Sequence, residues 1–281
     1  MSGLTIVAVA HLLWPGVEPT SLQRFLESLR ANPPGVSCEM VMIFKGFEPG
    51  STAEAERLKL LKGWTYRRID LEDKRMDLGD YRLVADRVSH KRVCFLNSHA
   101  EILCPDWLKH LTRALDKEDK AGMVGATGSF EMSGPETPFP NVHLRTNGFL
   151  IDRQLFLELD APDLSTKRGC GLFEAGPKSL TRQIVAKGLI PYVVDKTGKA
   201  FKPEDWRTSK TFRAEGQENL MIADNRTRHW HEADAVERRY LETLAWSGRD
   251  PGPNPAKRGK ASYWLKSISR RIKGNRPRFR S

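Results

Sequence analysis

The sequence lacks several features that would assign it at once to a class of protein. It has four cysteines, Cys38, Cys94, Cys104 and Cys170, and none of them forms a CxxC pair. They therefore predict neither a zinc knuckle nor a disulfide framework. Free cysteines of this kind are typical of a reducing cytoplasm. No run of about 18 apolar residues occurs, so no transmembrane helix is expected.

The short motifs of common nucleotide and hydrolase sites are also absent. The chain contains no P-loop, no GxGxxG fingerprint, no GxSxG nucleophile elbow and no HExxH zinc motif. These absences remove the usual support for phosphoryl transfer, hydride transfer and simple hydrolysis. Any activity has to be sought in another arrangement of polar residues.

The net charge of +11 is distributed unevenly along the chain. Residues 249–281 contain eleven Lys and Arg and one Asp, which leaves residues 1–248 with a net charge of +1. The sequence thus predicts two parts, a near-neutral domain over 1–248 and a basic linker and amphipathic tail over 249–281. Such an asymmetry indicates an anionic partner for the tail.

Within the tail, the segment 257–281 has the pattern of an amphipathic helix. Trp264, Leu265, Ile268 and Ile272 would share one face, and most basic residues would lie elsewhere. This composition is typical of a helix that lies on an anionic membrane. Nucleic acid is the competing anionic partner, and a disordered solubilising tail is the third interpretation.

The domain itself alternates between strand and helix patterns, which predicts an α/β fold with a mostly parallel sheet flanked by helices. Segment 160–171 is predicted to be a polar loop, and segment 196–228, which has no clear period, a lid over the sheet edge. Strands are expected at 5–10, 39–44, 64–69, 92–96, 122–128, 145–152 and 190–194, and helices at 20–29, 53–61, 79–88, 106–115, 154–159, 177–188 and 233–246.

A polar triplet follows the most apolar of these strands. Residues 93–96 form an unbroken apolar run, and Asn97, Ser98 and His99 come directly after it. Open α/β sheets bind ligands at the carboxyl ends of their strands. The triplet is therefore a candidate ligand site, and an ordinary polar turn is the competing interpretation.

The succession of segments resembles the glycosyltransferases of the GT-A fold, close to the large inverting family 2. The resemblance covers roughly residues 4–194 and is carried by DLGDYRLVADRV, VCFLNSHAEI, PDWLKHL, GMVGATG and GLFEAGPKSLTRQIVAKGLIPYVV. It implies a GT-A-like, Rossmann-like domain. It also implies transfer of a sugar from a nucleotide-sugar donor to a glycan or lipid-linked acceptor, with inversion.

The resemblance also implies a set of site residues. Where the family has an Asp-x-Asp triplet that holds a divalent metal, this chain has Asn97, Ser98 and His99. A Mn²⁺ or Mg²⁺ site built from His99, His229 and His231 and a metal-independent site are both open. Arg145 and Asn147 are predicted to hold the acceptor or a phosphate. The residues predicted to bind the nucleotide-sugar are His11, Lys45, Asp77, Asn97, Ser98 and His99.

Glu174 is the predicted catalytic base, because an inverting transfer needs one carboxylate to take the proton of the acceptor hydroxyl. The competing interpretation places Glu174 at a helix N-terminus, where the macrodipole favours a negative charge. Asp163 and Glu131 are the alternative bases.

Two other functions remain open from the sequence. One is a non-catalytic member of the fold that binds glycans or scaffolds partners, and the other is a nucleic-acid-binding protein that uses its tail. For the enzyme, the expected location is cytoplasmic, at the inner face of the membrane.

The tail yields the first testable prediction. A variant that ends at Gly248 should lose binding to anionic vesicles, and binding of the full chain should weaken as salt rises, because screening weakens attraction between surface charges. Vesicle co-sedimentation measures both effects. If the full chain ignores vesicles but binds duplex DNA, and Trp264→Ala changes neither result, the membrane interpretation is wrong.

Overall fold

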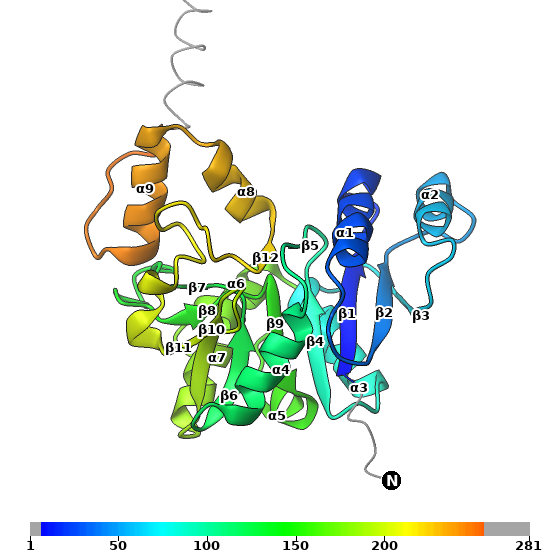
Figure 1. The fold of residues 1–281 in the computed structure, drawn as a ribbon, viewed down its shortest axis with the longest axis horizontal. Helices are drawn as coiled ribbons and strands as arrows, with labels where there is room; N and C mark the ends of the chain where they lie inside the picture. The colour runs from blue at the N-terminus through cyan, green and yellow to red at the C-terminus, as the bar shows by residue number, and fades with distance from the viewer. Residues whose placement is uncertain (1–6, 256–281) are drawn as a thin grey trace, which may run out of the picture.

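The computed structural model describes residues 7–255, and its centre is an eight-stranded sheet with helices on both faces (Figure 1). The strands run in the order β11-β10-β6-β9-β4-β1-β2-β3. The chain first builds the sheet outward from β1 to β3 and then returns to the other side of β1 with β4, which creates a topological switch point. The long strands are β1 Val7–Leu13, β2 Cys38–Lys45, β3 Arg67–Leu71, β4 Arg92–Leu96, β6 Ala121–Gly125, β9 Gly148–Asp152 and β10 Ile190–Val194.

Strand β9 is antiparallel to both of its neighbours, β4 and β6. In the register of the first pair, Leu96 at the end of β4 lies opposite Gly148 at the start of β9. The residues that precede β9 are therefore held beside the residues that follow β4. This is how residues 145–147 come to lie next to the polar triplet 97–99.

The two faces of the sheet are covered by separate apolar clusters. Alternate residues of β1 illustrate this, because Val7 and Val9 pack on one face and Ala8 and Ala10 on the other. The first cluster includes α1 Pro19–Ala31, α4 Trp107–Lys117 and the end of α2 Thr52–Leu60, and the second includes α3 Asp77–Arg87, α5 Arg153–Glu158, α6 Lys167–Ala175 and α7 Leu180–Ala186. No helix within 7–255 is long and apolar enough to cross a membrane.

The segment predicted as a lid, 196–228, does cover the sheet, but as part of the core. Its strand β11 Ala200–Phe201 extends the sheet beside β10, and β12 Ile222–Ala223 pairs with β5 Glu101–Ile102, just after the triplet. Trp206 and Phe212 are fully buried. Burial of these two large side chains stabilises a segment that shows no periodic pattern.

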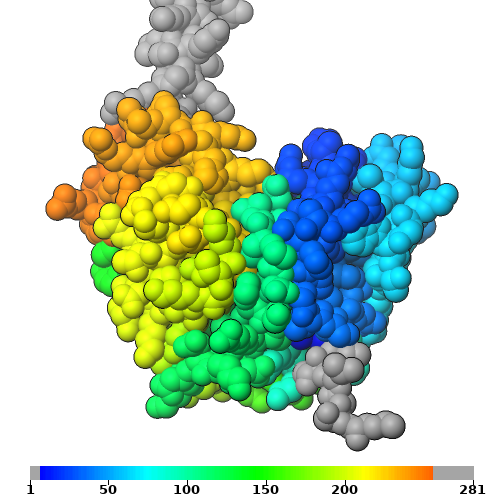
Figure 2. Space-filling model, in the orientation of Figure 1, coloured from blue at the N-terminus to red at the C-terminus, as the bar shows by residue number. Residues whose placement is uncertain are grey.

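Two helices complete the described chain, α8 Asn225–Glu232 and α9 Ala235–Trp246. They stand above the carboxyl edge of the sheet (Figure 1) and share a small apolar cluster that includes Trp230 and Leu241. In the space-filling view, the orange surface of this region and the blue N-terminal surface rise on either side of a notch (Figure 2). The short elements not yet bounded are β7 Gly128–Ser129, β8 His143–Leu144, η1 Pro203–Asp205 and η2 Arg207–Ser209.

The structure corrects three predictions about helices. Helix α6 occupies part of the predicted polar loop, because the Thr166 side chain caps it by accepting from the N–H of Gly169 at 3.0 Å. Helix α7 is capped by Ser179 and not by a start at Pro177. In the predicted helix 177–188 the sequence pattern places Leu180, Ile184 and Val185 on the buried side, but Val185 is 53% exposed. The predicted tail helix, 257–281, lies outside the described residues.

Candidate functional site

Polar residues from five parts of the chain lie at the carboxyl edge of the sheet, and we call this group the edge site. It comprises Lys45 at the end of β2, Asp77 at the start of α3, the triplet 97–99 after β4, segment 145–147 before β9, and Glu174 in α6. The backbone N–H of Asn97 donates to the carbonyl of Asn147 at 3.1 Å, which joins two of these parts. Parallel strands bring residues distant in sequence to one edge, where open sheets bind ligands.

Glu174 lies in the last turn of α6 with one carboxylate oxygen fixed. Its Oε1 accepts hydrogen bonds from the backbone N–H and from the hydroxyl of Thr146, both at 2.9 Å. Its Oε2 has no partner among the described residues. Because Glu174 lies at the C-terminal end of α6, the interpretation of Glu174 as a helix N-terminal residue is wrong. At this end of a helix the macrodipole disfavours a carboxylate. The arrangement leaves one oxygen able to accept a proton.

Lys45 of the edge site forms a buried charged pair with Asp80. The Lys45 Nζ lies 3.1 Å from the carboxylate of Asp73 and 3.6 Å from that of Asp80, and it also donates to the carbonyl of Arg75. Lys45 is only 6% exposed, so its ammonium holds the loop before α3 in place and is not directed to solvent. Lys45 is thus engaged with protein groups, and its contact with a nucleotide-sugar stays a prediction.

Two acidic side chains of α3 are affected by this burial. Burial raises the pKa of Asp77, and the nearby charge of Glu174 raises it further, while the Leu78 N–H and Lys45 act in the opposite direction. Burial also raises the pKa of Asp80 to about 6, although Lys45 lowers it. Neither carboxylate oxygen of Asp80 has a hydrogen-bond partner. The first turn of α3 therefore carries an electrostatic cost.

The triplet is a turn closed by its own side chain. The Oδ1 of Asn97 accepts from the N–H of His99 at 3.0 Å, which is the geometry of an Asx turn. The carbonyl of His99 accepts from both terminal nitrogens of Arg228 in α8, at 3.2 and 3.3 Å. Burial lowers the pKa of His99, and the charges of Arg228 and Arg24 lower it further, against Asp224. His99 is therefore neutral at pH 7.

Arg145 and Asn147 flank Thr146, which holds Glu174. The Nη2 of Arg145 lies 2.7 Å from the carboxylate of Asp224. The Oδ1 of Asn147 accepts from the Thr127 hydroxyl at 2.7 Å, but its Nδ2 is buried without a partner. A buried unpaired donor requires an explanation, and a ligand contact at this position is one.

The other histidines of the predicted site are His11, His229 and His231, and their surroundings differ from those that the sequence indicates. His11 belongs to β1, which continues beyond the predicted strand 5–10; its ring is fully buried and stacked on Phe25 with centroids 3.9 Å apart. Burial lowers its pKa to about 3, with a smaller contribution from His99. His229 pairs with Glu237 at 3.1 Å. His229 and His231 are two residues apart on a helix and so point about 200° apart, not to one side as on a strand.

The described residues do not provide the donor set of a divalent metal. Within 7–255, no three His, Cys, Asp or Glu side chains gather in a group that could hold one. Near the triplet, Glu101 is paired with Arg228 at 3.1 Å, and Asp224 is paired with Arg145. Mn²⁺ and Mg²⁺ prefer oxygen ligands, above all carboxylates. The predicted set His99, His229 and His231 is not formed.

Several residues of this region escape the sequence analysis. Thr146 holds the predicted base, and its only signal is its position between Arg145 and Asn147. His143 is buried close to Glu174, with Nδ1 2.7 Å from the carbonyl of Asn141. Asp224 has a recognisable signal, because its side chain and that of Thr227 form a capping box that begins α8.

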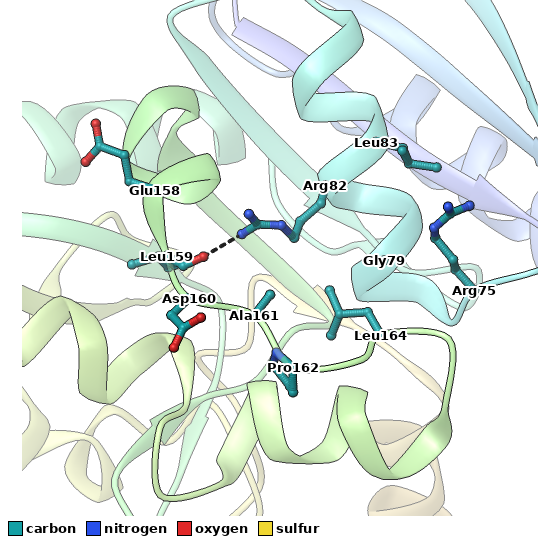
Figure 3. Close-up of a pocket in the computed structure, with 10 residues that line it drawn as sticks. All are labelled: Arg75, Gly79, Arg82, Leu83, Glu158, Leu159, Asp160, Ala161, Pro162 and Leu164. Atoms are coloured by element: carbon teal, nitrogen blue, oxygen red, sulfur yellow. Dashed lines mark hydrogen bonds between the residues drawn. The ribbon is translucent and has the colours of Figure 1, made fainter.

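A cavity of about 610 Å³ lies beside α3, and none of the edge-site residues is among those that line it (Figure 3). It is bounded by α3 and by segment 158–164. Arg82, one of the residues that line it, donates to the carbonyls of Phe156, Leu157 and Leu159 and so stabilises the C-terminus of α5. This arginine is engaged in holding the fold together, and the cavity is not the predicted site.

No protein-family model matches the sequence, and no curated protein matches it. The structure is similar to that of a mannosyltransferase from Pyrobaculum calidifontis, solved in complex with GDP-Man and Mn²⁺, with a TM-score of 0.50 and 12% sequence identity. That match covers 91% of this chain and 67% of the other. At this identity the similarity shows the fold alone.

Two further matches, both with a TM-score of 0.40, cover only part of each chain. One is glucosyl-3-phosphoglycerate synthase from Mycobacterium tuberculosis, at 12% identity over 55% of this chain and 57% of the other. The other is GalNAc-T7, at 17% identity over 56% of this chain and 36% of the other. The predicted GT-A-like α/β fold is confirmed by the sheet and by the mannosyltransferase match, whereas membership of family 2 stays a prediction.

The buried carboxylate of Asp80 gives a prediction about pH. Its folded-state pKa is raised, so its contribution to stability is present below about pH 4 and is lost as pH rises through about 6. Asp80→Asn removes this dependence. Relative to the parent, its free energy of unfolding should rise by roughly 2–3 kcal/mol between pH 4 and pH 8, as measured by urea denaturation. Asp86→Asn, at an exposed position of the same helix, is the control, and an equal change in both variants would contradict the prediction.

Proposed function

We propose that the protein is a glycosyltransferase that moves a sugar from a nucleotide-sugar donor to a hydroxyl of a glycan or lipid-linked acceptor, with inversion. The fold supports this proposal, since the mannosyltransferase with the same architecture is described with GDP-Man. The observation that carries it is the position of Glu174 at the carboxyl edge of the sheet, with Oε1 held by Thr146 and Oε2 free.

In the proposed reaction Glu174 acts as a general base. Its free Oε2 takes the proton of the acceptor hydroxyl while the hydroxyl oxygen forms a bond to the anomeric carbon. The bond from that carbon to the diphosphate oxygen breaks, and the nucleoside diphosphate leaves with the electron pair. The two bonds from Thr146 orient the carboxylate, so that the base is positioned before the substrate arrives.

The surroundings of the other two carboxylates disfavour them as the base. Glu131 is paired with Arg213 at 2.9 Å. Asp163 is exposed, in the loop before α6, where its Oδ1 accepts from the N–H and the hydroxyl of Ser165. Asn147, whose Nδ2 lies unpaired beside Thr146, is the residue best placed to contact the substrate near the base.

A non-catalytic role is the second candidate, because the metal-binding triplet of related enzymes is replaced here. A protein that binds glycans without turnover would keep the fold and would not need Glu174. The membrane-bound setting that we propose for the enzyme depends on the basic tail 257–281 and on the cytoplasmic location predicted from the free cysteines.

The first test is donor binding. A nucleoside diphosphate at 100 times its dissociation constant should stabilise the folded state by about 2.7 kcal/mol. Thermal unfolding of the full chain with UDP, GDP, CDP and TDP measures this shift, with adenosine as the control that lacks the diphosphate. The proposal fails if none of the four diphosphates raises the melting temperature.

The second test concerns the base. Glu174→Gln preserves the shape of the side chain but cannot take up the proton, so turnover of the sugar donor should fall by about 10²–10⁴-fold. Binding of the nucleoside diphosphate should change little. Asp163→Asn, at an exposed carboxylate in the same region, is the matched control and should retain full turnover. Loss of turnover in the control but not in Glu174→Gln would move the base to Asp163.

A further inference from the structure

The surroundings of the triplet carry positive charge, where a divalent metal site would carry negative charge. The Nη1 of Arg228 lies 3.1 Å from the Oε2 of Glu101, and the Nε of Arg24 lies 3.9 Å from the same oxygen. One carboxylate is thus shared by two guanidinium groups. These three side chains together have a net charge of +1.

Arg228 is fixed in this position before any ligand binds. Its two terminal nitrogens donate to the carbonyl of His99, so the guanidinium is attached directly to the third residue of the triplet. The side chain of Arg228 is 23% exposed and that of Arg24 is 43% exposed. Both groups therefore keep part of their surface available for further hydrogen bonds.

A divalent cation would meet two obstacles here. It would lie close to the guanidinium of Arg228, and Coulomb repulsion would oppose it. It would also have to displace Arg228 from Glu101 or Arg145 from Asp224, and Asp224 is only 1% exposed. Breaking the buried pair of Arg145 and Asp224 would leave an uncompensated buried charge, which is strongly destabilising.

We propose that the edge site binds the diphosphate of its donor without a divalent cation, and that Arg228 and Arg24 supply the positive charge. The proposal rests on the proposed function. Guanidinium groups bind phosphate oxygens through paired hydrogen bonds and stay charged at any physiological pH. Neutral His99 adds one N–H donor at the position where related enzymes place a carboxylate.

The role of Arg228 in this proposal differs from that of a structural clamp. Its bonds to His99 and Glu101 connect α8 to the turn after β4, and a clamp would affect only the stability of the fold. A group that binds diphosphate would affect nucleotide affinity in the absence of metal. The two roles are separated when unfolding and nucleotide binding are measured on the same variants.

The central experiment is calorimetric titration of the full chain with UDP and GDP, in EDTA and again in Mn²⁺. We expect the same dissociation constant, within about twofold, under both conditions. Binding that requires Mn²⁺ overturns the proposal and leaves the proposed function intact. Absence of nucleotide binding under both conditions overturns the proposed function itself.

Substitutions of the two arginines test whether they supply the positive charge that binds the diphosphate. Arg228→Gln and Arg24→Gln should each weaken nucleotide binding in EDTA by about tenfold or more, which corresponds to about 1.4 kcal/mol. Arg239→Gln, at an exposed arginine of α9, is the matched control and should bind as the parent does. Urea denaturation without nucleotide shows whether each variant is folded. If Arg228→Gln unfolds, the exposed Arg24→Gln decides, and unchanged affinity in that variant overturns the proposal.

Discussion

The pairing of β9 with β4 and β6 is the constraint on which the rest of the structure depends. Among the described strands, β9 is what joins β1 to β4 on one side with β6, β10 and β11 on the other. Because β9 runs antiparallel, its first residue lies opposite the last residue of β4. The segment before β9 is thereby fixed next to the triplet, and through Thr146 it also fixes Glu174. The antiparallel direction of β9 thus brings the triplet and Glu174, which are almost 80 positions apart in sequence, to the same segment.

The charges around this edge are nearly all neutralised in pairs, and the exceptions are informative. Arg145 neutralises Asp224, whereas the single carboxylate of Glu101 is shared by Arg228 and Arg24. Asp80, by contrast, is fully buried; its carboxylate lies 3.6 Å from the ammonium of Lys45 and has no hydrogen bond. Unpaired polar groups of this kind cost stability, and in proteins they are concentrated at functional sites. The edge site therefore lies next to polar groups whose burial costs stability, under the first turn of α3 and beside Thr146.

The C-terminal part of the described chain brings charged residues to the edge site that the strands of the sheet do not supply. Residues 196–224 bury Trp206 and Phe212 and deliver Asp224 to Arg145. Helix α8 then places Arg228 on the carbonyl of His99. These contacts link the triplet to residues about 130 positions later in sequence. They also place the guanidinium of Arg228 next to the triplet, so the charge beside this turn depends on the C-terminal part of the described chain.

The sequence by itself determined the fold class and most of the central strands. Residues 93–96 are buried on both faces and so form an apolar run, and the alternation of such runs with helical periods predicts a parallel sheet. It also identified the triplet and Glu174 as polar positions next to apolar elements. A local pattern was sufficient for these predictions, because the burial of a strand or helix is reflected in the apolar residues of that element itself.

Only the tertiary structure decided which polar residues meet. The predicted first strand ends at residue 10, but in the structure β1 extends to Leu13, so His11 is a buried strand residue stacked on Phe25. His229 and His231 share a face only on a strand, and the capping box at Asp224 makes the segment a helix. The partners of Glu174 and Arg228 are contacts between distant segments, and no local pattern encodes them. Their geometry follows from strand pairing across the sheet, which is the information that a linear pattern does not contain.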